Sequence, residues 1–167
     1  VNSILNPILV MCMGLGYYFN MYKGMPLVRE GGVIIMTHPT QPDFHPVHHP
    51  SYIDFFEQVL ADTTDPHVMS QKWEKQYAED EWYKHLYRTT YAYHGVHPFY
   101  MWYWGSHALQ HCSRIIIVGG DPKTVRRLGF VPASTMDDAL EIASDVVGRA
   151  PTITHLHSPP LMVADVS

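Results

Sequence analysis

Short continuous apolar runs, rather than alternating ones, dominate the hydrophobic pattern of this chain. Four such runs, each bounded by glycine, proline or polar residues, predict buried strands at 8–13, 32–37, 114–120 and 152–157. Strands that are apolar on both faces are typical of a parallel sheet covered on both sides. Two weaker strand predictions are 129–132 and 95–102, the latter interrupted by Pro98.

Predicted helices alternate with these runs. They occupy 18–29, 51–61, 70–93, 105–112, 121–129 and 134–148. Two of these helices have typical starts. Asp121 stands before Pro122, and Ser134 or Thr135 stands before an acidic first turn. The alternation predicts an α/β fold, with a parallel, Rossmann-like sheet and helices on both faces in three layers.

A histidine- and proline-rich stretch, 37–51, separates the second predicted strand from the next helix. Its four prolines favour extended backbone, so we expect a loop, and loops after strands are where open α/β sheets place ligand sites. The loop histidines are His38, His45, His48 and His49. Two interpretations stay open. The loop lines a cleft, or His45, His48 and His49 bind a metal, although their spacing matches no standard zinc pattern.

Composition narrows the possible functions. The chain has 167 residues, a formal net charge of −5 and no basic run, which argues against nucleic acid as a partner. No apolar run reaches membrane-spanning length, so we expect no membrane partner. Cys12 and Cys112 are read as unlinked thiols, which favours the reducing cytoplasm.

Two further segments carry candidate binding residues. Gln71, Lys72 and Lys75 lie in the first turns of a predicted helix, where Gln71 and Lys75 share a face. A lysine beside an amide suits a carboxylate ligand, but an ordinary solvated face explains the same pattern. The aromatic segment 87–105 adds Arg88, His94 and His97, and we predict that these three residues line a cleft together with His38 and His45. Packing in the core explains most of the aromatic rings of this segment equally well.

The order of several segments resembles the C-terminal domain of the lactate-racemase-like family. The most specific pieces are "NMYKGM" followed by "REGGVII", and "GGDP" followed by "LGFVPASTMDDAL". The resemblance covers 8–167, while 1–7 resemble a remnant of the preceding domain or a linker. It implies half of a two-domain racemase or epimerase that acts on 2-hydroxy acids and is inactive without its N-terminal domain.

The resemblance also implies a cofactor and residue roles. Family members carry a nickel-pincer nucleotide, held mainly by the N-terminal domain, which accepts a hydride from the substrate and returns it. The histidine bases also lie in that domain, so no catalytic residue is assigned to this chain. Lys75 matches the substrate-binding lysine of the family. The family glutamine falls on Lys72, beside Gln71, and this is a departure from the family pattern.

Three other interpretations remain open at this point. The chain is a non-catalytic domain that binds metal through the loop 38–49, an unrelated enzyme with His94 or His97 as general base, or a family member that has lost its chemistry. The racemase interpretation requires 37–51 and 70–76 to lie at the same edge of the sheet.

Overall fold

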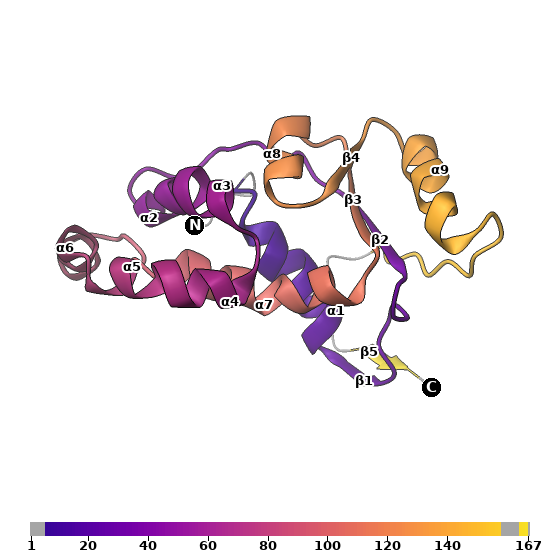
Figure 1. Ribbon diagram of the computed structural model, residues 1–167, viewed down its shortest axis with the longest axis horizontal. Coiled ribbons are helices and arrows are strands. Elements are labelled where there is room, and N and C mark those ends of the chain that lie inside the picture. Colours follow the sequence, from indigo (N-terminus) through magenta and orange to yellow (C-terminus); the bar gives the residue numbers. More distant parts are fainter. Residues whose placement is uncertain (1–5, 158–163, 167) are drawn as a thin grey trace.

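A parallel sheet of three strands forms one end of the molecule, and helices form the other (Figure 1). The computed structural model describes residues 6–157 and 164–166. The strand order is β2 (Val33–Thr37), β3 (Arg114–Val118) and β4 (Val131–Ala133). β2 and β3 were predicted as buried strands, and β4 as a short one, so the prediction of an α/β fold with a parallel sheet is confirmed.

The apolar side chains of the sheet divide between its two faces. Ile34 and Ile115, which are paired in register, belong to the main core together with residues of α8 (Pro122–Arg127). Ile35 and Ile116 form the next pair and pack on the opposite side with α9 (Met136–Val147). The continuous apolar runs are explained by this burial on both faces.

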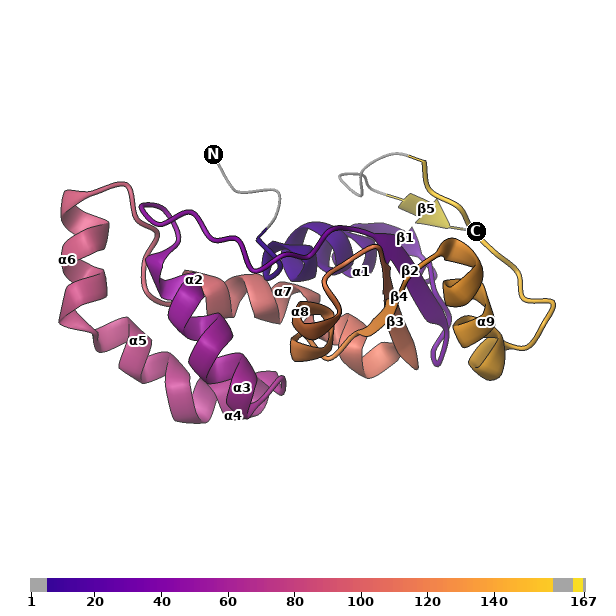
Figure 2. The same ribbon diagram turned by 90° about the horizontal axis from the view of Figure 1, so that it is seen from above.

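A long helical insertion connects β2 to β3. Its elements are α2 (Pro50–Asp54), η2 (Phe55–Val59), α3 (Leu60–Asp62), α4 (Pro66–Met69), η3 (Ser70–Glu74), α5 (Lys75–Glu79), α6 (Glu81–Thr89) and α7 (His97–His111). The first three run on as one helix, and α4, η3 and α5 as a second. In Figure 2 the insertion extends outward from the carboxyl ends of the strands.

The predicted helix 70–93 is interrupted at Asp80. The backbone of Asp80 is extended, which ends α5, and its carboxylate accepts a hydrogen bond from the backbone N–H of Tyr83 and so caps α6. The predicted strand 95–102 is wrong, because His97 and Pro98 begin helix α7. Proline is compatible with a first helical turn, where its missing N–H needs no partner.

The predicted strand 8–13 is also wrong. This segment belongs to η1 (Val10–Gly16), which continues into α1 (Tyr17–Asn20) and packs along α7. Two glycines permit the close approach, because a Cβ at Gly105 would collide with the backbone of Met11 and one at Gly16 with the Trp104 ring. A short apolar run does not by itself distinguish a strand from a buried helix.

Two predictions near the chain ends fail in a similar way. The expected helix 18–29 ends at Asn20 and gives way to β1 (Tyr22–Gly24), which pairs in parallel with β5 (Ala164–Val166). The expected strand 152–157 has no regular structure, and Ile153 is 66% exposed. A run of residues with high β propensity forms a strand only where it can pair with a neighbouring strand and pack one face against the core.

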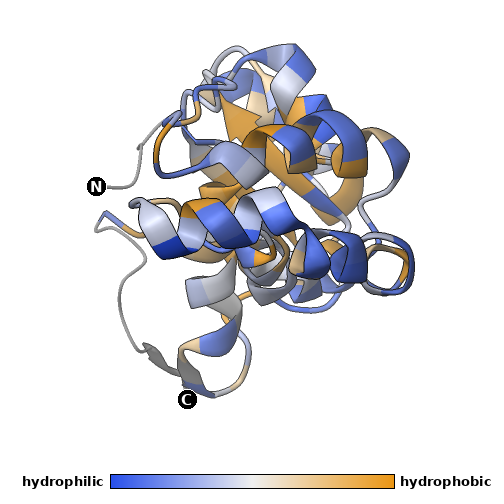
Figure 3. Ribbon diagram, turned by 90° about the vertical axis from the view of Figure 1, so that its left-hand side faces the viewer, coloured by the Kyte–Doolittle hydropathy of each residue, from blue (hydrophilic) through white to orange (hydrophobic). Residues whose placement is uncertain are grey.

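The main core continues into the helical end, where its residues are largely aromatic and lie beneath a polar surface. Tyr52, Phe55, Phe99 and Trp102 are fully buried, and the indole N–H of Trp102 donates to the carbonyl of Thr64. Figure 3 views this end and shows hydrophilic residues distributed over its helices, whereas apolar residues gather around the strands. None of the helices in residues 6–157 and 164–166 is both long and apolar enough to span a membrane.

Candidate functional site

The loop after β2 is fixed against the neighbouring strand at its start. The backbone N–H of His38 donates to the carbonyl of Val118, and its Nδ1 accepts from the N–H of Thr40 at 2.9 Å. The carbonyl of Pro39 accepts from the N–H of Asp121 at the start of α8. His38 therefore lies at the carboxyl end of the sheet, where the sequence predicted the cleft-lining histidine.

His45 and His48 stabilise the conformation of the loop itself. Their ring centroids lie 4.2 Å apart, and Nδ1 of His45 accepts from the backbone N–H groups of Val47 and His48. Nδ1 of His48 lies 2.9 Å from the carbonyl oxygen of Tyr91, so this nitrogen carries the proton and donates. One nitrogen of each imidazole is therefore committed to backbone hydrogen bonds.

His49 begins a group of ring contacts, which we call the histidine–tyrosine stack (His49, Tyr93, His97 and Tyr52); His49 and Tyr52 are buried, and Tyr93 and His97 are half-buried. The ring of Tyr93 lies nearly parallel to the rings of His49 and His97, at centroid distances of 5.4 and 4.3 Å. The hydroxyl of Tyr52 lies 2.6 Å from Nδ1 of His97. The stack thereby joins the histidine loop to the start of α7.

Burial keeps the imidazoles of this stack neutral. His49 is 0% exposed, and burial, followed by the fields of the His45 and His48 imidazoles, lowers its pKa to about 4. Burial also lowers the pKa of His97. Nδ1 of His49 lies 3.3 Å from the amide nitrogen of Asn6, while its Nε2 has no hydrogen-bond partner among the described residues.

The described residues contain no group of three or more His, Cys, Asp or Glu side chains arranged to hold a metal ion. His45, His48 and His49, the metal candidates of the loop, are instead occupied with backbone, ring and amide contacts. The geometry in this part of the chain therefore gives no support to a metal site built from the loop.

The other predicted cleft residues are dispersed. His94 accepts a hydrogen bond from the N–H of Val96 and meets the edge of Tyr87, and Arg88 lies exposed at the end of α6. Of the three candidates in 87–105, His97 is joined to the loop histidine His49 through the ring of Tyr93, which stacks on both.

The two candidate lysines have different surroundings. Nζ of Lys72 donates to both carboxylate oxygens of Asp62, at 2.9 and 2.8 Å, and the indole N–H of Trp73 donates to the same group. These bonds lower the pKa of Asp62 and join η3 to the end of α3. The Lys75 side chain is 83% exposed, with Glu79 at 3.9 Å, and Gln71 is exposed on the same helical face.

In Figures 1 and 2 the loop 37–51 and the helix that contains 70–76 lie on the same side of the sheet. The loop begins at the carboxyl end of β2, whereas Lys72 pairs with Asp62, two residues before Thr64, and Thr64 lies beside Gly129, just before β4 begins. The continuous helix of α2, η2 and α3 lies between them in both views. The two segments therefore lie on one side of the sheet and flank a helix, but only the loop is attached to the carboxyl ends of the strands.

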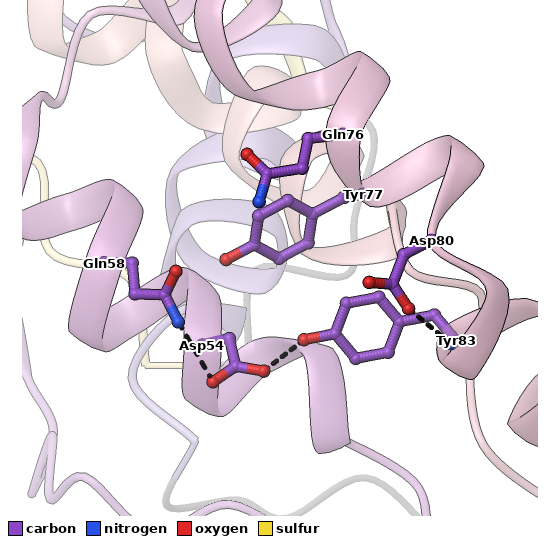
Figure 4. A pocket seen from close by; sticks show the side chains of 6 residues that line it. All are labelled: Asp54, Gln58, Gln76, Tyr77, Asp80 and Tyr83. Carbon is purple, nitrogen blue, oxygen red and sulfur yellow. Dashed lines mark hydrogen bonds between the residues drawn. The ribbon is translucent and has the colours of Figure 1, made fainter.

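Two small pockets accompany these elements. One, of about 160 Å³, lies where β3 and β4 end, and is lined by Gly119, Gly120, Pro122, Arg126, Pro132, Ala133 and Ser134. The other, of about 130 Å³, lies between the two long helices of the insertion that come first in the chain, 50–62 and 66–79 (Figure 4). Its lining residues are Asp54, Gln58, Gln76, Tyr77, Asp80 and Tyr83.

Sequence reasoning missed this second pocket, although a signal was present. Asp54 and Gln58 are a polar pair four residues apart that shares one face of its helix, and Gln76 and Asp80 have the same spacing in the sequence. Inside the pocket, the amide of Gln58 donates to Asp54 at 3.4 Å, and the hydroxyl of Tyr83 donates to the other oxygen of Asp54. Gln76 follows directly after Lys75, so this pocket adjoins the predicted substrate-binding helix.

Comparison of the sequence with known protein families and curated proteins, and of the fold with solved structures, finds no match. Function is therefore argued from the geometry and from the family resemblance of the sequence.

Proposed function

We propose that residues 8–167 form the C-terminal lobe of a two-domain, cytoplasmic racemase or epimerase of 2-hydroxy acids, with a three-layer, Rossmann-like architecture. One observation supports this most directly: the histidine loop 37–51 begins at the carboxyl end of β2, where the N–H of His38 donates to Val118 at the end of β3. Ligand sites of open α/β sheets lie at the carboxyl ends of the strands. A second lobe facing this end would complete a cleft between the two domains.

Lys75 and Gln71 are the residues of this chain that would bind the substrate carboxylate. Both are exposed on one helical face, and within the described part of the chain Lys75 has a single, long ion pair, to Glu79 of its own helix. The amide supplies a directed donor and the ammonium supplies charge. Lys72 is assigned a structural role because Asp62 already neutralises it.

The loop histidines would form the neighbouring wall of the cleft. The histidine–tyrosine stack holds the loop rigidly, and fixed groups around a substrate favour the reactive orientation. The nickel-pincer nucleotide implied by the resemblance would be held by the other domain and would supply hydride acceptance and return. The part of this chain is to orient the carboxylate and to shield the reacting carbon from water.

The test uses the longer protein that contains both lobes. Racemisation is followed with a 2-hydroxy acid deuterated at C2, such as L-lactate, and NMR shows whether the inverted product keeps the label. Lys75→Met is expected to raise KM by about tenfold or more, as expected for the loss of a charge-assisted hydrogen bond. Lys72→Met is the matched control, with KM expected to change by less than about threefold.

Two results would contradict the proposal. The lobe assignment is wrong if the two-lobed protein inverts none of a panel of 2-hydroxy acids. The carboxylate role is wrong if Lys75→Met and Lys72→Met change KM equally. A circular dichroism spectrum of each variant confirms that the fold is retained, so that a changed KM reports binding and not unfolding.

A further inference from the structure

The pocket between the two long helices of the insertion is rich in hydrogen-bond acceptors and carries a negative charge. Two of its lining side chains, Asp54 and Asp80, are carboxylates, and no lysine, arginine or histidine stands among the described residues that line it. Each carboxylate already accepts from a neighbour, Asp54 from Gln58 and Tyr83, and Asp80 from the backbone of Tyr83. These bonds fix the positions of both carboxylates, and each carboxylate has further lone pairs that can accept hydrogen bonds from a ligand.

Tyr77 supplies a second and independent observation. Its side chain is 3% exposed, its hydroxyl is buried, and that hydroxyl has no hydrogen-bond partner among the described residues. Figure 4 shows the hydroxyl directed into the pocket, toward Asp54 and Gln58. A buried hydroxyl without a partner costs free energy, which a bound ligand recovers by bonding to it.

From this geometry we infer that the pocket binds a small primary amine in its ammonium form that also carries a hydroxyl or carbonyl oxygen. The three N–H donors of the ammonium group match the acceptors of Asp54, Asp80 and the glutamine side chains. The oxygen of the ligand accepts from the hydroxyl of Tyr77. Burial, together with the nearby carboxylates, raises the pKa of Tyr77, so its phenol keeps the proton that it donates.

Other ligand classes fit this pocket less well. A divalent cation prefers six or more oxygen ligands with several carboxylates, and here only two carboxylates are present, both already bonded to neighbours. An anion would meet two like charges. A neutral polyol can bond to the amides and carboxylates but gains nothing from their charge. The inference stands apart from the racemase proposal, because Lys75 and Gln71 do not line the pocket.

The test is a titration of the 167-residue chain with ethanolammonium chloride at pH 7, followed by calorimetry and by chemical shifts in the NMR spectrum. We expect saturable binding with a dissociation constant on the order of 1–10 mM, which is reasonable for a ligand of so few atoms. Sodium chloride at equal ionic strength, tetramethylammonium chloride and glycerol should each give no saturable shift at the pocket residues. Tetramethylammonium carries the charge without donors, and glycerol the hydroxyls without charge.

Two variants locate the site. Asp54→Asn should weaken ethanolammonium binding about tenfold or more, because it removes a charge but keeps an acceptor for Tyr83. Tyr77→Phe should weaken binding several-fold, about three to ten times, while the free protein keeps or gains thermal stability, since its hydroxyl has no partner to lose. Asp137→Asn, an exposed carboxylate on α9, is the matched control and should bind as the unmodified chain does.

The outcome is decisive in either direction. Unchanged affinity in both Asp54→Asn and Tyr77→Phe would overturn the inference, and so would equal binding of glycerol or of tetramethylammonium. A loss of stability in Tyr77→Phe without ligand would show that the hydroxyl already has a structural partner, and that result also counts against the site. Because the measurement needs neither a second lobe nor turnover, its failure is distinct from a failure of the racemase proposal.

Discussion

The hydroxyl of Tyr52 lies 2.6 Å from Nδ1 of His97, although the two residues belong to α2 and to the first turn of α7. Burial raises the pKa of Tyr52, so the phenol stays protonated at neutral pH and is the donor of this bond. His97 then accepts through Nδ1 and carries its own proton on Nε2. One short hydrogen bond thereby fixes a tautomer and joins the first helix of the insertion to the start of the last.

Replacement of Tyr52 by phenylalanine is expected to lower the free energy of unfolding by about 1–2 kcal/mol. The ring still fills its buried site, but Nδ1 of His97 loses its donor. Urea denaturation measures the change, with Tyr91→Phe as the control, because Tyr91 is exposed and its loss should stay within about 0.5 kcal/mol. Equal stability of the two variants would show that the bond contributes nothing.

Acid should destabilise the fold through His49. The pKa of its imidazole is about 4 in the folded protein and about 6.5 when the chain is unfolded, so the unfolded state takes up the proton first as the pH falls. The contribution of His49 is therefore complete above about pH 6.5 and is lost toward pH 4, at a cost of roughly 3 kcal/mol. The lowered pKa of His97 acts in the same direction.

Urea melts between pH 4 and 7.5 measure this dependence, and a His49→Gln variant isolates the contribution of His49. The variant should show a shallower fall in stability with acid, because glutamine does not titrate. His107→Gln, an exposed position on α7, should keep the full slope. A slope that is identical in all three proteins would mean that His49 is not the group responsible.

Gly105→Ala should destabilise the protein by about 1–3 kcal/mol. Alanine favours a helix over glycine, but here its methyl group would collide with the backbone of Met11 in η1. Gln110→Ala, on an exposed position of the same helix, is the control and should leave the thermal midpoint nearly unchanged. If Gly105→Ala raised the midpoint, η1 and α7 would not be as close as the structure places them.

Loss of the cap of α9 should also be measurable. The hydroxyl of Thr135 accepts from the N–H of Asp138, while the carboxylate of Asp138 accepts from the N–H of Thr135. Thr135→Ala is therefore expected to cost about 1 kcal/mol by urea denaturation. Thr135→Ser keeps the oxygen and should restore most of this stability, whereas equal losses would exclude capping as the cause.

The elements that could be predicted from the sequence are those determined by neighbouring residues, such as apolar runs, turn residues and helix caps. β3 combines a run of isoleucines with turn residues after it, and α8 and α9 begin at caps that can be recognised from the sequence. The segment 8–13 looked equally strand-like but is helical. Two close contacts decide the structure there, Gly16 against Trp104 and Gly105 against Met11, and in each the two residues lie far apart along the chain.

The candidate site shows a similar division. The position of the histidine loop at the end of β2 followed from local sequence, and so did the shared helical face of Gln71 and Lys75. The pairing of Lys72 with Asp62 and the convergence of Asp54 with Tyr83 did not, because these depend on how two helices lie side by side. The spacing of apolar and polar residues shows which face of a helix is buried, but it does not show which other helix packs against that face.

The helical insertion between β2 and β3 has a kinetic consequence. Val33 and Arg114 are neighbours in the sheet yet stand roughly eighty positions apart along the chain, so pairing them requires closure of a very large loop. Contacts of such long range slow folding, and the packing of α7 on η1, near the start of the chain, is of similarly long range. The helices that contain Asp62 and Lys72 meet across only ten positions of the chain. We therefore expect this pair of helices to form early, and the sheet and the contact of α7 with η1 to form last, in the rate-limiting step.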